Sequence, residues 1–480
     1  MTFHPPHRLF QFIIHTFLAI TLILNTSPAL ASLPTLGDPT LSSFSTQQEK
    51  QLGLAFYRSL RANLEFVDDL QINYYLNMLG NRLVTHSDAA GKQFKFFIIK
   101  APTINAFAGP DAYIGVHSKL IIAAKNESQL AGVLAHEIAH VAQRHLARQF
   151  SRSGKSTAIT LATLLAAILV GAQDPQSGQA VLLTGLAGNQ QSAINNTRKN
   201  ENEADRVGIG ILQRSGINPI GMVQFFKILM AQSPDNAMPY LRDHPLSSAR
   251  VAEARNRITP KTRNLPTDSI DFEFARARLM VLVSPQPEKY TQNKVVGTSN
   301  LGQYKKALAL IRTNYAGKAV GVLKKINKQH NNLWIQLALA EAYSASKQDK
   351  KALALLKNLS SLYPGLLPVT IAYARSLLAN KQAENSIQLL KRQLQQNNPI
   401  SLHDYAVIYN ALAHAYFANG QVSAALEATG NQYAKQGYLE LAIQQYNNAL
   451  LQKNNSASTI KRLKTVKKEI KSQVIRLKEK

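Results

Sequence analysis

The chain has 480 residues, enough for two domains, and it contains no cysteine. Disulfides and a lipoprotein anchor are therefore excluded, and stability has to come from a packed core. Lys and Arg outnumber Asp and Glu by 55 to 28, a formal net charge of +27. This charge favours acidic partners or anionic surfaces, although high solubility alone also accounts for it.

The first 31 residues have the pattern of a secretory signal peptide. Arg8 precedes an apolar run over 9–24, and Ala29-Leu30-Ala31 is an A-x-A cleavage site. We therefore expect export and cleavage after Ala31, with an uncleaved membrane anchor as the alternative. Nucleic acid is not expected as a partner, because an exported protein has little access to it.

The chain that follows is predicted to be α+β and predominantly helical, with a small sheet. Residues 43–85 have helical character, and the stretch over 69–83 is amphipathic. Residues 93–100 and 112–117 are predicted strands, the first with alternating apolar side chains. Helices dominate from there to about residue 257.

One of these helices carries the most informative motif of the sequence, His-Glu-Ile-Ala-His. His136 and His140 are four residues apart, so both imidazoles can face one Zn²⁺ ion. Glu137 lies beside them, where it can accept a proton from the attacking water. Asn126 and Gln129 provide an N-cap and a capping-box partner. A core helix with incidental histidines is the alternative, but such polar groups are costly in an apolar helix.

An acidic segment downstream offers the third ligand. Glu201 and Asp205 are four residues apart on a predicted helix, so one can bind the metal while the other orients a ligand histidine. Without the histidine motif, this segment would be read as a solvated helix start. His145 would lie on the opposite side of the first helix from His136, and we interpret it as a surface or structural residue.

Two further segments define the organisation of the chain. The apolar stretch over 157–172 is short for a membrane span, and we predict a buried helical hairpin, with an interfacial membrane contact as the alternative. Pro, Thr and charged residues near 258–267 indicate a boundary. We predict a first domain over 32–265, a helical connector over 266–300 and a second domain over 301–480.

The second domain is predicted to be an all-α solenoid of tetratricopeptide repeats, although an unrelated helical bundle is the alternative. Small and large residues recur there with a period near 34, which lets paired helices approach closely. The positions are Ala307, Ala319, Ala340, Tyr343, Ala352, Leu356, Ala374, Leu390, Ala413 and Ala425, with an ambiguous last unit around Gly430 and Gly437. Such a solenoid binds partners through a concave surface.

The segments HEIAHVAQRH, ENEADRVG and DHPLSSAR, followed by these repeats, resemble the gluzincin zinc peptidases related to the CAAX prenyl proteases. Within that group, the chain is most similar to the family of periplasmic β-barrel assembly-enhancing proteases. The resemblance implies one zinc ion per chain, held by His136, His140 and Glu201. It also implies that Glu137 is the general base and that Asp205 supports the site.

The same resemblance assigns roles to two other segments. His244 would lie near the zinc and either close the site or assist catalysis, while a plain loop histidine is the alternative. Arg250 would stabilise the oxyanion or anchor that loop. Asn105, Ala106 and Phe107 match a strand beside the cleft, where an extended substrate pairs by strand addition.

The sequence therefore predicts an exported zinc endopeptidase with a docking domain, and the resemblance implies that it acts in the periplasm in outer-membrane protein quality control. Its expected partners are unfolded or misassembled outer-membrane proteins, the outer-membrane assembly machinery and an anionic membrane surface. The main alternative is a chaperone or scaffold whose peptidase site is largely latent. A general secreted digestive protease is disfavoured, because digestion needs no docking surface.

Overall fold

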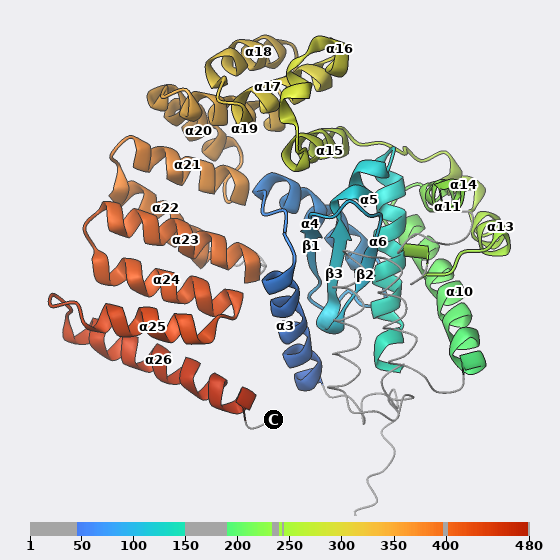
Figure 1. Cartoon of the computed structure of the whole chain (residues 1–480), viewed down its shortest axis with the longest axis horizontal. Coiled ribbons are helices and arrows are strands. Elements are labelled where there is room, and N and C mark those ends of the chain that lie inside the picture. The colour runs from blue at the N-terminus through green and yellow to red at the C-terminus, as the bar shows by residue number, and fades with distance from the viewer. Residues whose placement is uncertain (1–45, 149–189, 233–239, 242–243, 397–401, 479–480) are drawn as a thin grey trace, which may run out of the picture. The chain divides into compact units, whose positions relative to one another are not determined.

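The computed structural model shows a predominantly helical chain with one small sheet, which confirms the predicted fold class (Figure 1). The predicted signal peptide and the apolar segment over 157–172 lie outside the residues that the structure describes. The described residues are 46–148, 190–232, 240–241, 244–396 and 402–478.

The N-terminal helical region consists of two helices rather than one. Helix α3 spans Thr46–Asn63 and α4 spans Leu70–Thr85. Between them the chain is extended, and Phe66 pairs with Ile99 in an isolated bridge. Asp69 then caps α4 by accepting hydrogen bonds from two backbone N–H groups of its first turn. Both helices lie within the region of predicted helical character, and the N-cap at Asp69 sets where the second one begins.

The sheet has three strands in the order β1-β3-β2. Strand β1 (Lys95–Ile99) is parallel to β3 (Tyr113–His117), and β2 (Ala106–Ala108) is antiparallel to β3. Strand β2 is therefore an edge strand of this sheet, and α6 (Glu127–Ala142) lies beside it (Figure 1). Asn126 caps α6 as predicted, since its side chain accepts a hydrogen bond from the backbone N–H of the third helical residue.

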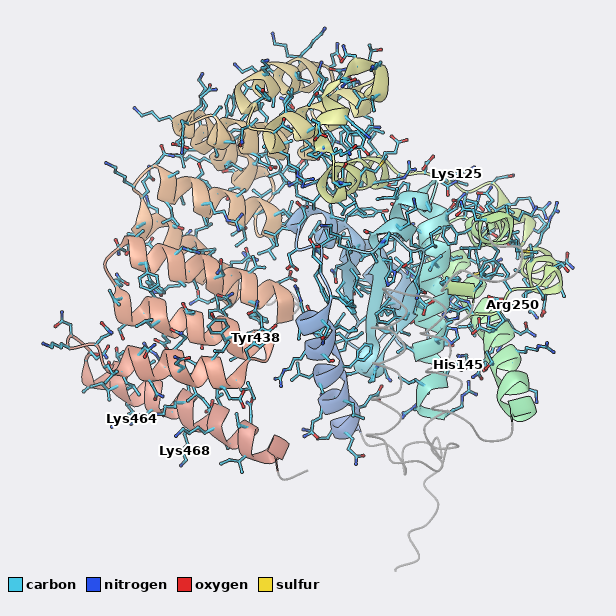
Figure 2. All side chains as sticks on the ribbon, viewed as in Figure 1. Lys125, His145, Arg250, Tyr438, Lys464 and Lys468 are labelled. Carbon is cyan, nitrogen blue, oxygen red and sulfur yellow. The ribbon has the colours of Figure 1, made fainter. Side chains whose placement is uncertain are left out.

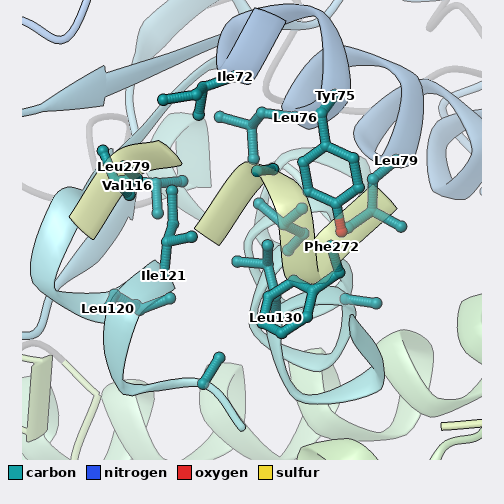
Figure 3. Packing of buried hydrophobic residues seen from close by; sticks show 14 of the residues in the cluster. Ile72, Tyr75, Leu76, Leu79, Val116, Leu120, Ile121, Leu130, Phe272 and Leu279 are labelled. Carbon is teal, nitrogen blue, oxygen red and sulfur yellow. The ribbon is translucent and has the colours of Figure 1, made fainter. Parts of the chain in front are cut away.

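A continuous apolar core joins the sheet to the surrounding helices. Tyr75, Leu79 and Ile121 meet Leu130 of α6 and Phe272 of α15 in its centre (Figure 3). The remaining elements of the sheet-containing half either cover this core or connect the elements that do. They are α5 (Ser118–Ala123), α10 (Gln190–Arg214), α11 (Ile220–Gln232), α13 (Ser248–Asn256), α14 (Pro260–Arg263), α15 (Ile270–Val283) and α16 (Asn293–Val296), with 3-10 turns at Pro110–Ala112 and Pro287–Thr291.

From residue 300 onward the described chain is a succession of helices that pack in sequence order (Figure 1). The small residues of the predicted repeat, from Ala307 to Ala425, are buried between them. The helices are α17 (Asn300–Arg312), α18 (Ala316–Gln329), α19 (Leu333–Ala345), α20 (Asp349–Leu362), α21 (Leu367–Ala379), α22 (Ala383–Gln395), α23 (Leu402–Ala418), α24 (Val422–Gln436), α25 (Leu439–Leu450) and α26 (Ala457–Lys478).

A left-handed residue marks the turn inside each of the first four helix pairs. Asn314, Lys347, Lys381 and Gly420 all have φ between 61° and 73°. Gly437, with φ of 86°, forms a similar turn between α24 and α25. Helix α24 therefore ends one repeat and begins the next, which explains why the sequence register was ambiguous around it.

The apolar core does not end where the repeats begin. The cluster that contains Ile72 and Leu130 continues through α17 and α19 to Ala352 in α20. Arg278 of α15 is buried there between two acidic partners, at 2.7 Å from Asp69 and 3.1 Å from Glu341. The first repeats thus share one core with the sheet-containing half, while the exact domain boundaries at 265 and 300 remain predictions.

Candidate metal centre

The predicted site lies on helices α6 and α10, and α6 packs closely against both α10 and α11. Gly132 of α6 lies so close to α11 that a Cβ atom would be 2.7 Å from the backbone of Met222. At Gly208 of α10, a Cβ atom would be 3.3 Å from the backbone of Ala135 in α6. These contacts bury α6 on all sides, and so they place its two motif histidines against α10.

The structure brings the predicted ligands together around one point. His136 Nε2 lies 3.0 Å from His140 Nε2 and 3.3 Å from Glu201 Oε2. His140 Nε2 lies 3.4 Å from Glu201 Oε1. His244 joins the same group, because its Nδ1 is 3.2 Å from His136 Nε2 and 3.1 Å from Glu201 Oε1. All four ligand atoms lie within 4.8 Å of one another.

These distances fit a tetrahedral metal ion. Ligand atoms about 2.0–2.1 Å from a zinc ion at tetrahedral angles are about 3.3 Å apart. The separations of 3.0 to 3.4 Å among these groups match the edges of such a tetrahedron. Two imidazoles and a carboxylate are also the donors that such an ion prefers. The cluster is therefore suited to bind a metal.

A second layer of contacts orients His136. Its Nδ1 lies 3.0 Å from Asp205 Oδ1, so the ring can direct Nε2 toward the cluster. Arg250 holds Asp205 in turn with two hydrogen bonds of 2.8 Å, and it also lies 3.1 Å from Glu201. Its third contact is a hydrogen bond to the carbonyl of Pro245. In this structure Arg250 therefore anchors the two carboxylates and the loop that carries His244. Figure 2 labels Arg250 and His145 on the side of the molecule that carries α10.

Glu137 is fully buried beside the cluster, and one of its carboxylate oxygens lies 3.4 Å from His244 Nε2. His244 thus bridges the two acidic groups of the site, Glu201 on its Nδ1 side and Glu137 on its Nε2 side. The ring of Tyr240 covers His244, with centroids 4.8 Å apart. The loop histidine predicted near the zinc is therefore inside the cluster.

The pKa values of the site residues are set by burial and by neighbouring charges. Burial opposes the charged form of His136, but Asp205 and Glu201 outweigh it and raise its pKa to about 10. Burial likewise disfavours the imidazolium of His244, and the two neighbouring glutamates still raise its pKa. For His140, burial dominates and its pKa falls well below the ordinary value. The carboxyl of Asp205 keeps a lowered pKa, because His136 and Arg250 overcome its burial.

His145 is not on the surface, contrary to one part of the sequence interpretation. It is 4% exposed, and its Nδ1 is 2.7 Å from His140 Nδ1. Helix α6 ends at Ala142, and Arg144 adopts a left-handed conformation with φ of 53°. The expected rotation assumed a longer helix, whereas this turn brings His145 back toward the metal ligands.

The residues expected to bind substrate lie on the sheet edge. Ala106 and Phe107 belong to β2, and the carbonyl of Asn105 accepts a hydrogen bond from the backbone N–H of His117. All three side chains are buried, so only the backbone of this strand is suited to contact a peptide. The substrate role itself stays a prediction.

Comparison with known proteins agrees with this geometry. Residues 71–258 match the family model described as Peptidase family M48. The β-barrel assembly-enhancing protease of Escherichia coli (strain K12) is 32% identical over 445 residues, which cover 90% of each chain. The putative β-barrel assembly-enhancing protease of Vibrio cholerae is 32% identical over 450 residues, 90% of this chain and 92% of that one.

The chain belongs to this family of M48 peptidases. The resemblance seen in the sequence is thereby confirmed, and so is the prediction of a metalloendopeptidase.

Proposed function

We propose that this metallopeptidase is a zinc endopeptidase that is exported to the periplasm and acts on outer-membrane β-barrel proteins that fail to assemble. The observation that carries the proposal is the buried convergence of His136, His140 and Glu201 on one point, with Glu137 buried beside it. Relatives that match nine-tenths of the chain are named for β-barrel assembly, which supports this substrate class.

The residues of the chain divide the chemistry between them. His136, His140 and Glu201 would hold the zinc ion, and a bound zinc ion would polarise the scissile carbonyl and acidify water at the site. Glu137 accepts the proton of the attacking water and passes it to the leaving amine. Arg250 keeps Asp205 charged and in place, so that His136 presents Nε2 rather than Nδ1 to the cluster.

Substrate binding would use an edge strand and a repeat surface. Strand β2 lies at the sheet edge beside α6, and an extended, unfolded segment could pair with its backbone. The helices from α17 to α26 would dock partners such as the outer-membrane assembly machinery. The basic helix α26 and the net charge of +27 suit an anionic membrane surface. Among the described residues, no helix is long and apolar enough to cross a membrane.

A chaperone or scaffold with a largely latent peptidase site is the second candidate. The position of His244 favours it, because its Nδ1 lies 3.2 Å from His136 Nε2 and 3.1 Å from Glu201 Oε1, within the ligand group. Catalytic zinc sites keep a fourth position open for water and substrate, whereas structural sites fill it with a protein ligand. Release of the His244 loop would then precede hydrolysis.

The test compares the wild type with Glu137→Gln, both purified without residues 1–31. Bound metal and cleavage of an unfolded outer-membrane β-barrel protein are measured, with Glu65→Gln at an exposed position as the matched control. We expect about one zinc per chain in all three proteins and cleavage in all but Glu137→Gln. Zinc without cleavage by the wild type would favour the latent site, and His244→Ala should then release activity. Absence of zinc from the wild type would refute the proposal.

A further inference from the structure

Among the described residues, the Nδ1 of His140 has no carboxylate partner, whereas the Nδ1 of His136 has one. Asp205 orients His136 at 3.0 Å, and Arg250 fixes Asp205. The corresponding nitrogen of His140, Nδ1, faces His145 Nδ1 instead, at 2.7 Å. The described residues thus provide two metal-ligating histidines with different supports, one acidic and one a third histidine.

The third histidine is itself held by a charged group. His145 Nε2 lies 3.0 Å from Glu203 Oε2, and Arg148 donates a hydrogen bond of 2.8 Å to the same oxygen. Glu203 stands on α10 between Glu201 and Asp205 in sequence, so one helix provides the ligand carboxylate and both supporting carboxylates. The chain His140–His145–Glu203–Arg148 mirrors the chain His136–Asp205–Arg250.

The hydrogen positions follow from this order. His140 Nε2 points into the ligand cluster, so it must offer a lone pair there, and Nδ1 carries the proton. Nδ1–H therefore donates to the lone pair of His145 Nδ1. His145 Nε2 then carries a proton and donates to the carboxylate of Glu203. Each contact is satisfied only in this one arrangement, which fixes the tautomer and the ring angle of His140.

We propose that His145 and Glu203 are positioning residues that orient His140 for metal binding through this hydrogen-bonded chain. The proposal rests on the metal centre proposed above. The two residues touch neither metal nor substrate in this role, and they act by holding a ligand ring in one orientation. The left-handed backbone of Arg144 turns the chain after α6, and this turn brings His145 within reach of His140.

The test measures metal affinity in the full chain by competition with a zinc chelator, and ligand geometry by the visible spectrum of the cobalt-substituted protein. His145→Leu introduces an apolar side chain and removes the acceptor, and we expect a 10- to 100-fold weaker affinity and a changed cobalt spectrum. His145→Asn retains an acceptor near the Nδ1 position, and we expect it to restore most of the affinity. His330→Leu, at an exposed histidine of the repeats, is the matched control and should leave both readouts unchanged.

The outcomes separate a positioning role from simple packing. If His145→Leu binds zinc as tightly as the wild type, or if His145→Asn is no better than His145→Leu, the proposal is overturned. Glu203→Gln tests the same chain at a partly exposed position should the leucine variant not fold, and wild-type affinity there would also overturn it. If the wild type binds no metal at all, the proposed function fails first, which is a distinguishable result.

Discussion

Replacing Arg250 by methionine would remove a guanidinium that is shared by Asp205, Glu201 and the carbonyl of Pro245. The Arg250 and Asp205 side chains are 7% and 6% exposed, and two hydrogen bonds of 2.8 Å join them. Breaking a buried ion pair from one side leaves an uncompensated charge and costs about 3–5 kcal/mol. We therefore expect Arg250→Met to lower the free energy of unfolding by that amount.

A double-variant cycle isolates the pair. In Arg250→Met combined with Asp205→Asn, both charges are gone, so the loss should be smaller than the sum of the single losses by about 1–3 kcal/mol. The assay is urea unfolding of the metal-free protein, because bound metal would add its own stabilisation. Arg257→Met, which breaks an exposed pair with Glu253, is the control and should cost less than about 1 kcal/mol.

The same variant distinguishes the two roles considered for Arg250. As an anchor, it should affect stability, metal affinity and turnover together. Unchanged unfolding and metal affinity with a large loss of turnover would refute the anchoring argument and favour a direct contact with the oxyanion of the reaction.

Three further results are expected. Arg278→Met should lower the free energy of unfolding in urea by about 3 kcal/mol, because the largely buried Asp69 loses its ion-pair partner; an unchanged midpoint would contradict this. Burial lowers the pKa of His117 from 6.5 to about 4, so the unfolded chain binds the extra proton. This difference contributes about 3 kcal/mol to the free energy of unfolding above pH 6.5, and the contribution is lost as pH falls through 4. His117→Gln should flatten that part of the pH profile of unfolding. Gly132→Ala should overpack the contact with α11, which costs about 1–3 kcal/mol of stability and lowers the melting temperature. An unchanged melting temperature would argue against the close helix contact.

Local spacing indicated four residues of the centre, whereas His244 was assigned only through the family resemblance. His136 and His140 share a helical face because of their separation, and Glu201 and Asp205 do so for the same reason. The structure places all four within one buried cluster. Their proximity in space could be expected from the chemistry, since a pair of buried histidines requires acidic or metal partners.

Features that depend on chain direction or on distant residues were not predictable in this way. The role of His145 depends on where α6 ends and on the left-handed turn at Arg144, which no glycine marks in the sequence. Similarly, Arg278 meets Asp69 and Glu341 across 209 and 63 residues of sequence. A helical pattern shows which face of α15 is buried but not which charged groups lie opposite that face.

The shared core has a consequence for the order in which the chain folds during synthesis. The apolar cluster that contains Leu130 also includes residues of α15, α17 and α19, and it is complete only at Ala352. A growing polypeptide that ends before this point leaves the shared core incomplete. We therefore expect the peptidase half to reach its full stability late, when about three-quarters of the polypeptide has been made.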